Sequence, residues 1–189
     1  MTQYLYSAEA VAEGHPDKLC DQISDAILDQ VLRNDHYARA LVETVVTQGL
    51  VLVTGELTTK AYVDLDRLVR DTIRKVGYND PDTGFDYRAC AVLTLLREQS
   101  EQIATLVDER RAGDQGMMVG FATDEAAELG TDTQLMPMPI AVAQALARRL
   151  RDVRRDGTLP QLRPDGKCQV TFAYENRLPQ GLALSLIHI

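Results

Sequence analysis

Residues 13–33, EGHPDKLCDQISDAILDQVLR, join an extended segment to a strongly amphipathic helix and decide how this chain folds. Apolar side chains recur at helical spacing from Leu19 to Val31. Pro16 suits the first turn of a helix, where a missing N–H costs nothing. The positive end of the helix dipole then lies beside His15 and Asp17 and points toward any group bound there. A histidine, a carboxylate and a lysine at a helix N-terminus favour a site for a phosphate and its metal ion.

The residues on both sides of this segment predict an α+β fold. The predicted elements are a strand at 4–9, a helix at 16–33, a hairpin of 39–47 and 50–58, a helix at 64–76 and a strand at 89–96. Asp64 can cap the second helix, and Gly77 lies where its C-terminal stop belongs. The order β-α-β-β-α-β is the split βαβ unit, with two helices on one face of a small sheet.

A second unit of the same kind begins after this one and stops partway. The predicted elements are a strand at 117–122, a helix at 138–154 and a strand at 168–175, with no hairpin partner after them. We therefore expect a complete unit at 1–100, a mobile loop at 101–116 and a truncated second unit at 117–183. Residues 184–189, LSLIHI, resemble a translated sequencing adapter and are left out of the fold prediction, so His188 carries no functional weight.

Composition and charge exclude several classes of function. The net charge is −8 and aromatic residues are 5% of the 189, which disfavours nucleic-acid binding. No apolar run reaches the length that spans a membrane, and the first residues are neither basic nor apolar over a sufficient length for us to expect a targeting segment there. The three cysteines, Cys20, Cys90 and Cys168, predict reduced thiols packed in cores, and hence a cytoplasmic protein. The chain has no GxxxxGK[ST] motif, which disfavours a P-loop kinase.

Several motifs in a fixed order show that the chain resembles the N-terminal half of S-adenosylmethionine synthetases, the methionine adenosyltransferases. The matching segments are EGHPDKLCDQISDAILD (13–29), LVTGELTT (52–59), CAVLTLL (90–96), AGDQGMMVGFATDE (112–125), LMPMPI (135–140) and GTLPQLRPDGKCQVTFAYE (157–175). They cover nearly all of residues 3–175, and several motifs in order are far more specific than one.

The resemblance implies an enzyme that transfers adenosyl from ATP to the sulfur of L-methionine. In that reaction the sulfur attacks C5′, the triphosphate leaves, and it is then hydrolysed to phosphate and pyrophosphate. The family fold is three similar β-α-β-β-α-β domains. Two Mg²⁺ ions per site and K⁺ are the implied cofactors. The implied assembly is a homodimer or a dimer of dimers, a homotetramer, with active sites shared between subunits.

The resemblance also assigns roles to the residues that bind the nucleotide and the metals. His15 is the expected catalytic donor to the oxygen that leaves C5′, and Asp17 is an expected Mg²⁺ ligand. Asp165 and Lys167 match ATP-binding positions, and Lys167 meets phosphate as a catalytic point charge. Glu43 matches a K⁺ ligand. Without the resemblance, these residues also fit a helix cap, a dipole partner, a common turn and a solvent-facing strand residue.

Methionine contacts are expected from three further residues. Glu56 matches the residue that holds the ammonium group, Gln99 matches a methionine contact, and Asp114 matches an acidic residue near adenosine and methionine. Each has an ordinary alternative as a strand, loop or turn residue. The role of Lys18 is open: it is either solvated or paired with Asp21.

Two features of the chain differ from the family pattern. The loop before Asp114 is shorter, and the insertion at 126–134 is longer, than in the bacterial members considered. The C-terminal half, with the second magnesium carboxylate and a glycine-rich phosphate loop, is missing, so we expect this fragment alone to be inactive. The alternative is a catalytically retired, synthetase-like regulatory or binding module. We expect the arginine cluster at 148–155 to be a solvated helix face.

Overall fold

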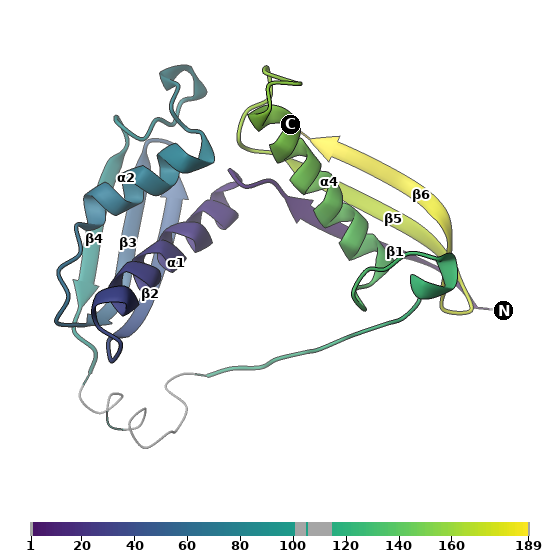
Figure 1. The fold of residues 1–189 in the computed structure, drawn as a ribbon, viewed down its shortest axis with the longest axis horizontal. Coiled ribbons are helices and arrows are strands. Elements are labelled where there is room, and N and C mark those ends of the chain that lie inside the picture. Colours follow the sequence, from purple (N-terminus) through teal and green to yellow (C-terminus); the bar gives the residue numbers. More distant parts are fainter. Residues whose placement is uncertain (1, 101–104, 106–114, 189) are drawn as a thin grey trace. The chain divides into compact units, whose positions relative to one another are not determined.

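The computed structural model of the chain describes residues 2–100, 105 and 115–188. These residues form two compact units, one of residues 16–118 and one of residues 1–15 with 119–189. Among the described residues, each unit has a three-stranded sheet, with two α-helices packed on it in the first unit and one in the second (Figure 1). The predicted α+β class and the one-sided helix packing are therefore confirmed. The boundaries predicted for the domains remain a prediction.

The unit of residues 16–118 contains the helices and the hairpin that the apolar periodicity predicts. It consists of α1 (Pro16–Asn34), β2 (Arg39–Thr47), β3 (Leu50–Thr58), α2 (Leu65–Val76), a 3-10 turn (Pro81–Thr83) and β4 (Ala91–Arg97). β2 pairs with β3 antiparallel, and β3 pairs with β4 in parallel. Asp64 caps α2 by accepting from the Arg67 amide at 3.1 Å, and Gly77 ends the helix in the left-handed region at φ 113°.

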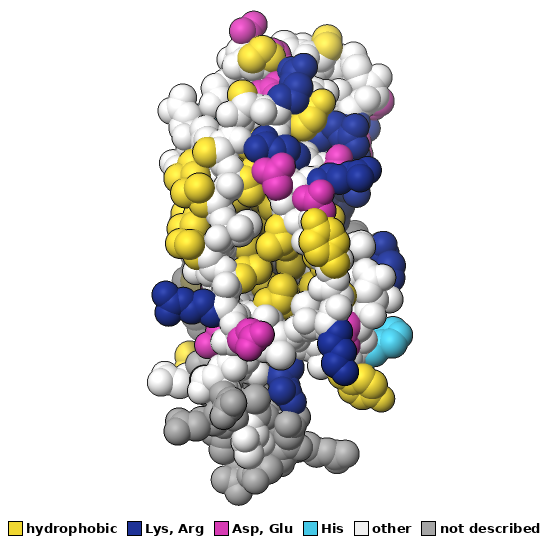
Figure 2. Space-filling view, turned by 90° about the vertical axis from the view of Figure 1, so that its left-hand side faces the viewer, with side chains coloured by type: hydrophobic (Ala, Val, Ile, Leu, Met, Phe, Trp, Pro, Cys, Tyr) yellow, Lys and Arg dark blue, Asp and Glu magenta, His cyan; other side chains and the backbone are white. Residues whose placement is uncertain are grey.

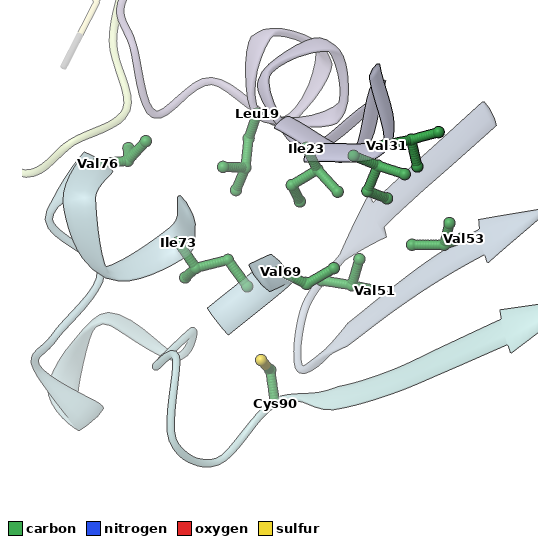
Figure 3. Packing of buried hydrophobic residues seen from close by; sticks show 10 residues of the cluster. Leu19, Ile23, Val31, Val51, Val53, Val69, Ile73, Val76 and Cys90 are labelled. Carbon is green, nitrogen blue, oxygen red and sulfur yellow. The ribbon is translucent and has the colours of Figure 1, made fainter. Parts of the chain in front are cut away.

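The core of this unit lies between the two helices and the sheet (Figure 3). Ile23, Ile27 and Val31 of α1 and Ile73 of α2 are almost completely buried. They meet Val51 and Val53, which alternate with less buried residues along β3, as a one-sided sheet requires. Cys90 lies at the edge of the same cluster, as predicted for a small core residue.

The second unit contains β1 (Gln3–Val11), a 3-10 turn (Ala127–Leu129), α4 (Met138–Arg155), β5 (Lys167–Glu175) and β6 (Leu178–His188). Its sheet has the order β1-β5-β6, with both pairs antiparallel. α4 packs on β1 and β5 through small side chains, because Ala143 and Ala147 are buried against Cys168 and Val170. Small residues at these positions bring the helix close to the strands.

The expectation that residues 4–9 share a sheet with residues 39–58 is wrong. β1 pairs with β5 over nine positions, from Gln3 opposite Glu175 to Val11 opposite Lys167. The physical reason is side-chain fit: Tyr4 stacks on Tyr174 with ring centroids 5.1 Å apart, and Ala8 and Ala10 pack into the cluster under α4. Local patterns predict that a strand exists, but they do not predict which strand it joins.

Two further expectations are corrected by this sheet. Residues 117–122, expected to form a strand, are in neither a helix nor a strand, and the sheet of this unit consists of β1, β5 and β6. The hairpin partner expected to be missing is present as β6, which includes residues 184–188 that the prediction left out. Within the described residues, no helix is both long and apolar enough to cross a membrane.

Candidate functional site

The loop that carries His15 lies directly against the loop that precedes Lys167. The Ala12 amide donates to the carbonyl oxygen of Gly166 at 2.7 Å, and the Gly14 amide donates to that of Pro164 at 3.0 Å. A Cβ atom added to Gly14 would lie 2.4 Å from Pro164 Cβ, so only glycine allows this approach. Two predicted nucleotide-binding segments that lie about 150 residues apart in the chain are thus brought together within one unit.

Lys167 and Asp165, the two predicted nucleotide contacts in that loop, have defined surroundings. Lys167 Nζ lies 2.5 Å from Glu9 Oε2, and about half of each side chain is exposed. Asp165 Oδ1 accepts a hydrogen bond from the Gly166 amide at 2.7 Å, which stabilises the turn. Sequence reasoning did not single out Glu9. Its position follows from the β1–β5 register, in which Val11 lies opposite Lys167.

Asp17, the predicted Mg²⁺ ligand, lies in the first turn of α1, which begins at Pro16 as predicted. A carboxylate at this position interacts favourably with the helix dipole. The described residues contain no cluster of three or more His, Cys, Asp or Glu side chains that could hold a metal on their own. One carboxylate is nevertheless compatible with Mg²⁺, which is usually held by one or two carboxylates together with substrate phosphates and water.

Glu43 and Glu56 lie on the face of the β2-β3-β4 sheet that α1 and α2 do not cover. Glu43 is opposite Thr54 and Glu56 is opposite Leu41, so both carboxylates alternate with the core-facing residues. Gly55 precedes Glu56 with φ 121°, and a Cβ atom added there would lie 2.1 Å from the Leu41 carbonyl oxygen. The backbone beside Glu56 therefore requires glycine, as expected for a close approach. Glu43 is the exposed residue of the pair.

Gln99 lies just after β4, at the start of the segment expected to be mobile. Its amide donates to Thr58 Oγ1 at 3.0 Å, which ties the segment to the end of β3. The side-chain oxygen Oε1 is buried without a hydrogen-bond partner in the described part of the chain. A buried orphaned acceptor is costly and indicates a site that a donor group can fill. Asp114 and most of the expected mobile loop, 101–116, lie outside the described residues.

The arginine cluster near the end of α4 is only partly the solvated face that was expected. Arg148 and Arg149 are exposed. Arg154 and Arg155 instead form ion pairs with Glu13, and the hydrogen bond to Glu13 raises the pKa of Arg155. Helical periodicity does not reveal this contact, because Glu13 lies in a loop about 140 residues away.

The cysteines have surroundings that suit packing better than chemistry. Burial raises the pKa of the Cys20 and Cys90 thiols, which keeps both in the protonated, unreactive form. The Cys168 thiol is buried and donates to the carbonyl oxygen of Ala143 at 3.0 Å. None of the three forms a disulfide. The prediction that they are small core residues without a catalytic role fits these surroundings.

Comparison with known proteins matches both units of the chain to one family. The model of the S-adenosylmethionine synthetase N-terminal domain matches residues 3–101, and that of the central domain matches residues 109–188. An S-adenosylmethionine synthase from Desulforudis audaxviator (strain MP104C) is 54% identical over 95% of this chain and 47% of its own length. One from Clostridium botulinum (strain Alaska E43 / Type E3) is 52% identical over 93% of this chain and 47% of its own.

A third S-adenosylmethionine synthase, from Sorangium cellulosum (strain So ce56), is 50% identical over 95% of this chain and 43% of its own length. The chain therefore spans about half the length of the curated relatives it matches.

Proposed function

The chain belongs to the S-adenosylmethionine synthetase family, and on this premise we propose that it is the N-terminal half of a methionine adenosyltransferase. The proposed reaction transfers the adenosyl group of ATP to the sulfur of L-methionine and yields S-adenosylmethionine, phosphate and pyrophosphate. The observation that carries this proposal is the contact between the His15 loop and the Asp165–Lys167 loop. That contact supports the proposal because it joins the loop of His15, the proposed hydrogen-bond donor, to the loop that precedes Lys167, the proposed phosphate-binding cation.

The chemistry assigns each of these residues a step. The methionine sulfur attacks C5′ with its lone pair, the bond from C5′ to the triphosphate oxygen breaks, and a sulfonium product forms. Negative charge grows on the departing oxygen, and we assign His15 as the hydrogen-bond donor to it. Lys167 binds a phosphate oxygen of the nucleotide, and this contact replaces its ion pair with the Glu9 carboxylate. Asp165 is assigned to nucleotide binding beside it.

Asp17 is proposed as a ligand of Mg²⁺ and Glu43 as a ligand of K⁺. When bound, the two Mg²⁺ ions of a site would offset part of the charge of the triphosphate. Asp17 supports this role because it supplies a carboxylate at a helix N-terminus. The second magnesium ligand and the glycine-rich phosphate loop belong to the half that lies outside this chain, so the fragment alone is proposed to be inactive.

Methionine binding is proposed for Glu56 and Gln99, with Asp114 near both substrates. Glu56 supplies a negative charge for the methionine ammonium group. The orphaned Gln99 Oε1 is a buried acceptor, and a donor on the substrate would satisfy it. Both residues belong to the unit of residues 16–118, Glu56 in β3 and Gln99 just beyond β4.

We propose that the protein forms a homodimer, or a dimer of dimers, through the uncovered face of the β2-β3-β4 sheet. This face presents four large apolar side chains that are 46–65% exposed, namely Leu41, Val45, Leu93 and Leu95. Figure 2 views this unit from the side of β4 and shows hydrophobic side chains grouped at its surface. Apolar surface of this kind marks an interaction site. Glu43 and Glu56 lie on the same face, which supports sites shared between subunits.

The dimer proposal predicts that Leu95→Asp converts the full-length enzyme to monomers in analytical ultracentrifugation. Leu129→Asp is the matched control, because Leu129 is 51% exposed in the other unit. An unchanged mass for the Leu95 variant would contradict this interface.

We also propose a cytoplasmic location, which three cysteines without a disulfide support. The segments 1–100, 101–116, 117–183 and 184–189 remain our proposed division of the chain.

The experiment that tests the proposed function begins with long-read resequencing of the locus through the codon for Leu184. If the frame continues into a second half, the full-length protein is purified and supplied with ATP, L-methionine, Mg²⁺ and K⁺. We expect S-adenosylmethionine by mass spectrometry, with phosphate and pyrophosphate in equal amounts, and no product without Mg²⁺. No product from the folded full-length protein would overturn the proposal. A frame that truly ends at Ile189 would favour the retired regulatory module.

A further inference from the structure

Charged side chains hold the loop that carries His15, in addition to its backbone hydrogen bonds. Arg155 binds the Glu13 carboxylate with two parallel hydrogen bonds, Nε to Oε1 at 2.8 Å and Nη2 to Oε2 at 2.6 Å. Arg154 Nη2 also donates to Oε1. This paired geometry fixes the carboxylate in direction as well as in position, which a single contact would not do.

The burial of these side chains distinguishes them from an ordinary surface ion pair. The Glu13 and Arg154 side chains are each 14% exposed, whereas Arg155 is 50% exposed. A pair that is largely removed from water is not screened as exposed pairs are, and removing one member leaves the other charge without compensation. The geometry of the Glu13 loop is therefore sensitive to each of these side chains.

Glu13 lies at the centre of the segment that contacts the nucleotide loop. The amides of its neighbours, Ala12 and Gly14, donate to Gly166 and Pro164. The His15 amide donates back to the Ala12 carbonyl oxygen at 3.1 Å, so the backbone of His15 is set by this turn. Arg154 lines the same small cavity as Ala12, Pro164 and Asp165. Both arginines thus connect the end of α4 to the Glu13 loop, and Arg154 also lies beside the loop of Pro164 and Asp165.

We propose that Glu13, Arg154 and Arg155 are positioning residues that hold His15 against the Asp165–Lys167 loop for nucleotide binding. This inference rests on the proposed function, because it gives the two loops a common ligand, ATP. The positioning cluster of Glu13, Arg154 and Arg155 acts through the loop geometry and does not itself contact the substrate. Its loss therefore weakens ATP binding selectively, and methionine binding, which is assigned to other elements, is unaffected.

The test uses the full-length enzyme with the variants Glu13→Gln and Arg154→Gln and their combination. Glu13→Gln keeps the size of the side chain but removes its charge. We expect each single variant to raise both the Kd of ATP with Mg²⁺, by isothermal titration calorimetry, and the KM for ATP by about tenfold, the effect of one strong contact. The KM for methionine stays within about twofold. The double variant is expected to bind ATP no more weakly than the single variant with the higher Kd, because the residues act as a unit.

Arg148→Gln is the matched control, because Arg148 is exposed on the same helix and is expected to bind ATP as the wild type does. Arg155→Lys is the second variant if Glu13→Gln fails to fold. It keeps the positive charge but loses the paired hydrogen bonds to Glu13. We expect it to raise the Kd of ATP, but by less than the roughly tenfold increase expected for Glu13→Gln. An unchanged Kd of ATP in folded variants, even with a lowered melting temperature, would overturn the positioning role. Equal increases in KM for both substrates would also overturn it.

The readouts separate this inference from the proposed function. If the wild-type enzyme binds ATP but forms no S-adenosylmethionine, the proposed function fails, and the Kd values still decide the role of the positioning cluster. If the wild type does not bind ATP at all, the positioning role is overturned as well.

Discussion

Gly14→Ala tests the contact between the two loops that are proposed to bind the nucleotide. The added Cβ atom would lie 2.4 Å from Pro164 Cβ, 2.5 Å from Pro164 C and 2.6 Å from Pro164 O. Separations below 3.0 Å are essentially never found for Cβ atoms. The atoms that would have to move belong to the backbone and a proline ring, which have no alternative rotamer. The loops must therefore separate.

The cost follows from what the separation breaks. Overpacking of this kind costs about 1–3 kcal/mol. The hydrogen bonds from Ala12 to Gly166 and from Gly14 to Pro164 contribute about 0.5–1.5 kcal/mol each. The free energy of unfolding is then expected to fall by about 2–6 kcal/mol, a large share of the stability of a typical domain.

Urea unfolding of the chain, followed by tyrosine fluorescence, measures this change. The chain has no tryptophan, and Tyr4, Tyr6 and Tyr174 form a ring cluster in the affected unit. Gly120→Ala is the control, because a Cβ atom added at Gly120 would meet nothing within 4 Å. A Gly14→Ala midpoint that matches the wild type, or an equal loss in the control, would refute the close approach inferred here.

Three further changes test other parts of the structure. A side-chain hydrogen bond from the Arg88 guanidinium lowers the pKa of Asp86 from 3.8 to about 2. The stability that this ion pair contributes is therefore fully present above pH 3.8 and is lost as the pH falls toward 2. Arg88→Leu is therefore expected to return the pKa of Asp86 toward 3.8 in an NMR titration, and an unchanged pKa would rule out this ion pair as its cause. Tyr174→Phe removes the hydroxyl that donates to the buried Glu125 at 2.7 Å, and we expect it to lower the free energy of unfolding by about 1–3 kcal/mol in urea. Wild-type stability in that variant would show that the hydrogen bond contributes nothing. Gly55→Ala would place a Cβ atom 2.1 Å from a carbonyl oxygen of β2, and we expect it to raise the KM for methionine in the full-length enzyme; an unaltered KM would separate this glycine from the methionine site.

Local chemistry explains why so many elements could be predicted from the sequence. Helix α2 begins and ends where Asp64 and Gly77 predict, because a side-chain cap and a left-handed residue act within one turn of the helix. The hairpin of β2 and β3 has the predicted bounds, since its turn and its alternation both lie within 20 residues. Information of this kind is contained in the segment itself.

The errors concern contacts between segments that are far apart in the chain. Periodicity assigns a strand at 4–9 but cannot tell that its partner is β5. The same limitation applies to residues 117–122, whose apolar residues fit the pattern of a strand although they join neither sheet. The contact of Glu13 with Arg154 and Arg155 depends on this pairing as well, so it could not be predicted before the pairing was known.

The pairing of β1 with β5 also determines which side chains surround the proposed phosphate site. In the observed register Cys168 and Val170 face α4, so Lys167 lies on the opposite face beside Glu9. A slip of one residue would exchange the two faces and bury the lysine charge under the helix, at a large desolvation cost. Ser7 and Thr171, whose hydroxyl oxygens are 2.8 Å apart on the same face as Lys167, favour the observed register over the slipped one. The residues that fix the register of this sheet therefore also keep Lys167 on the exposed face, where the proposed nucleotide contact requires it.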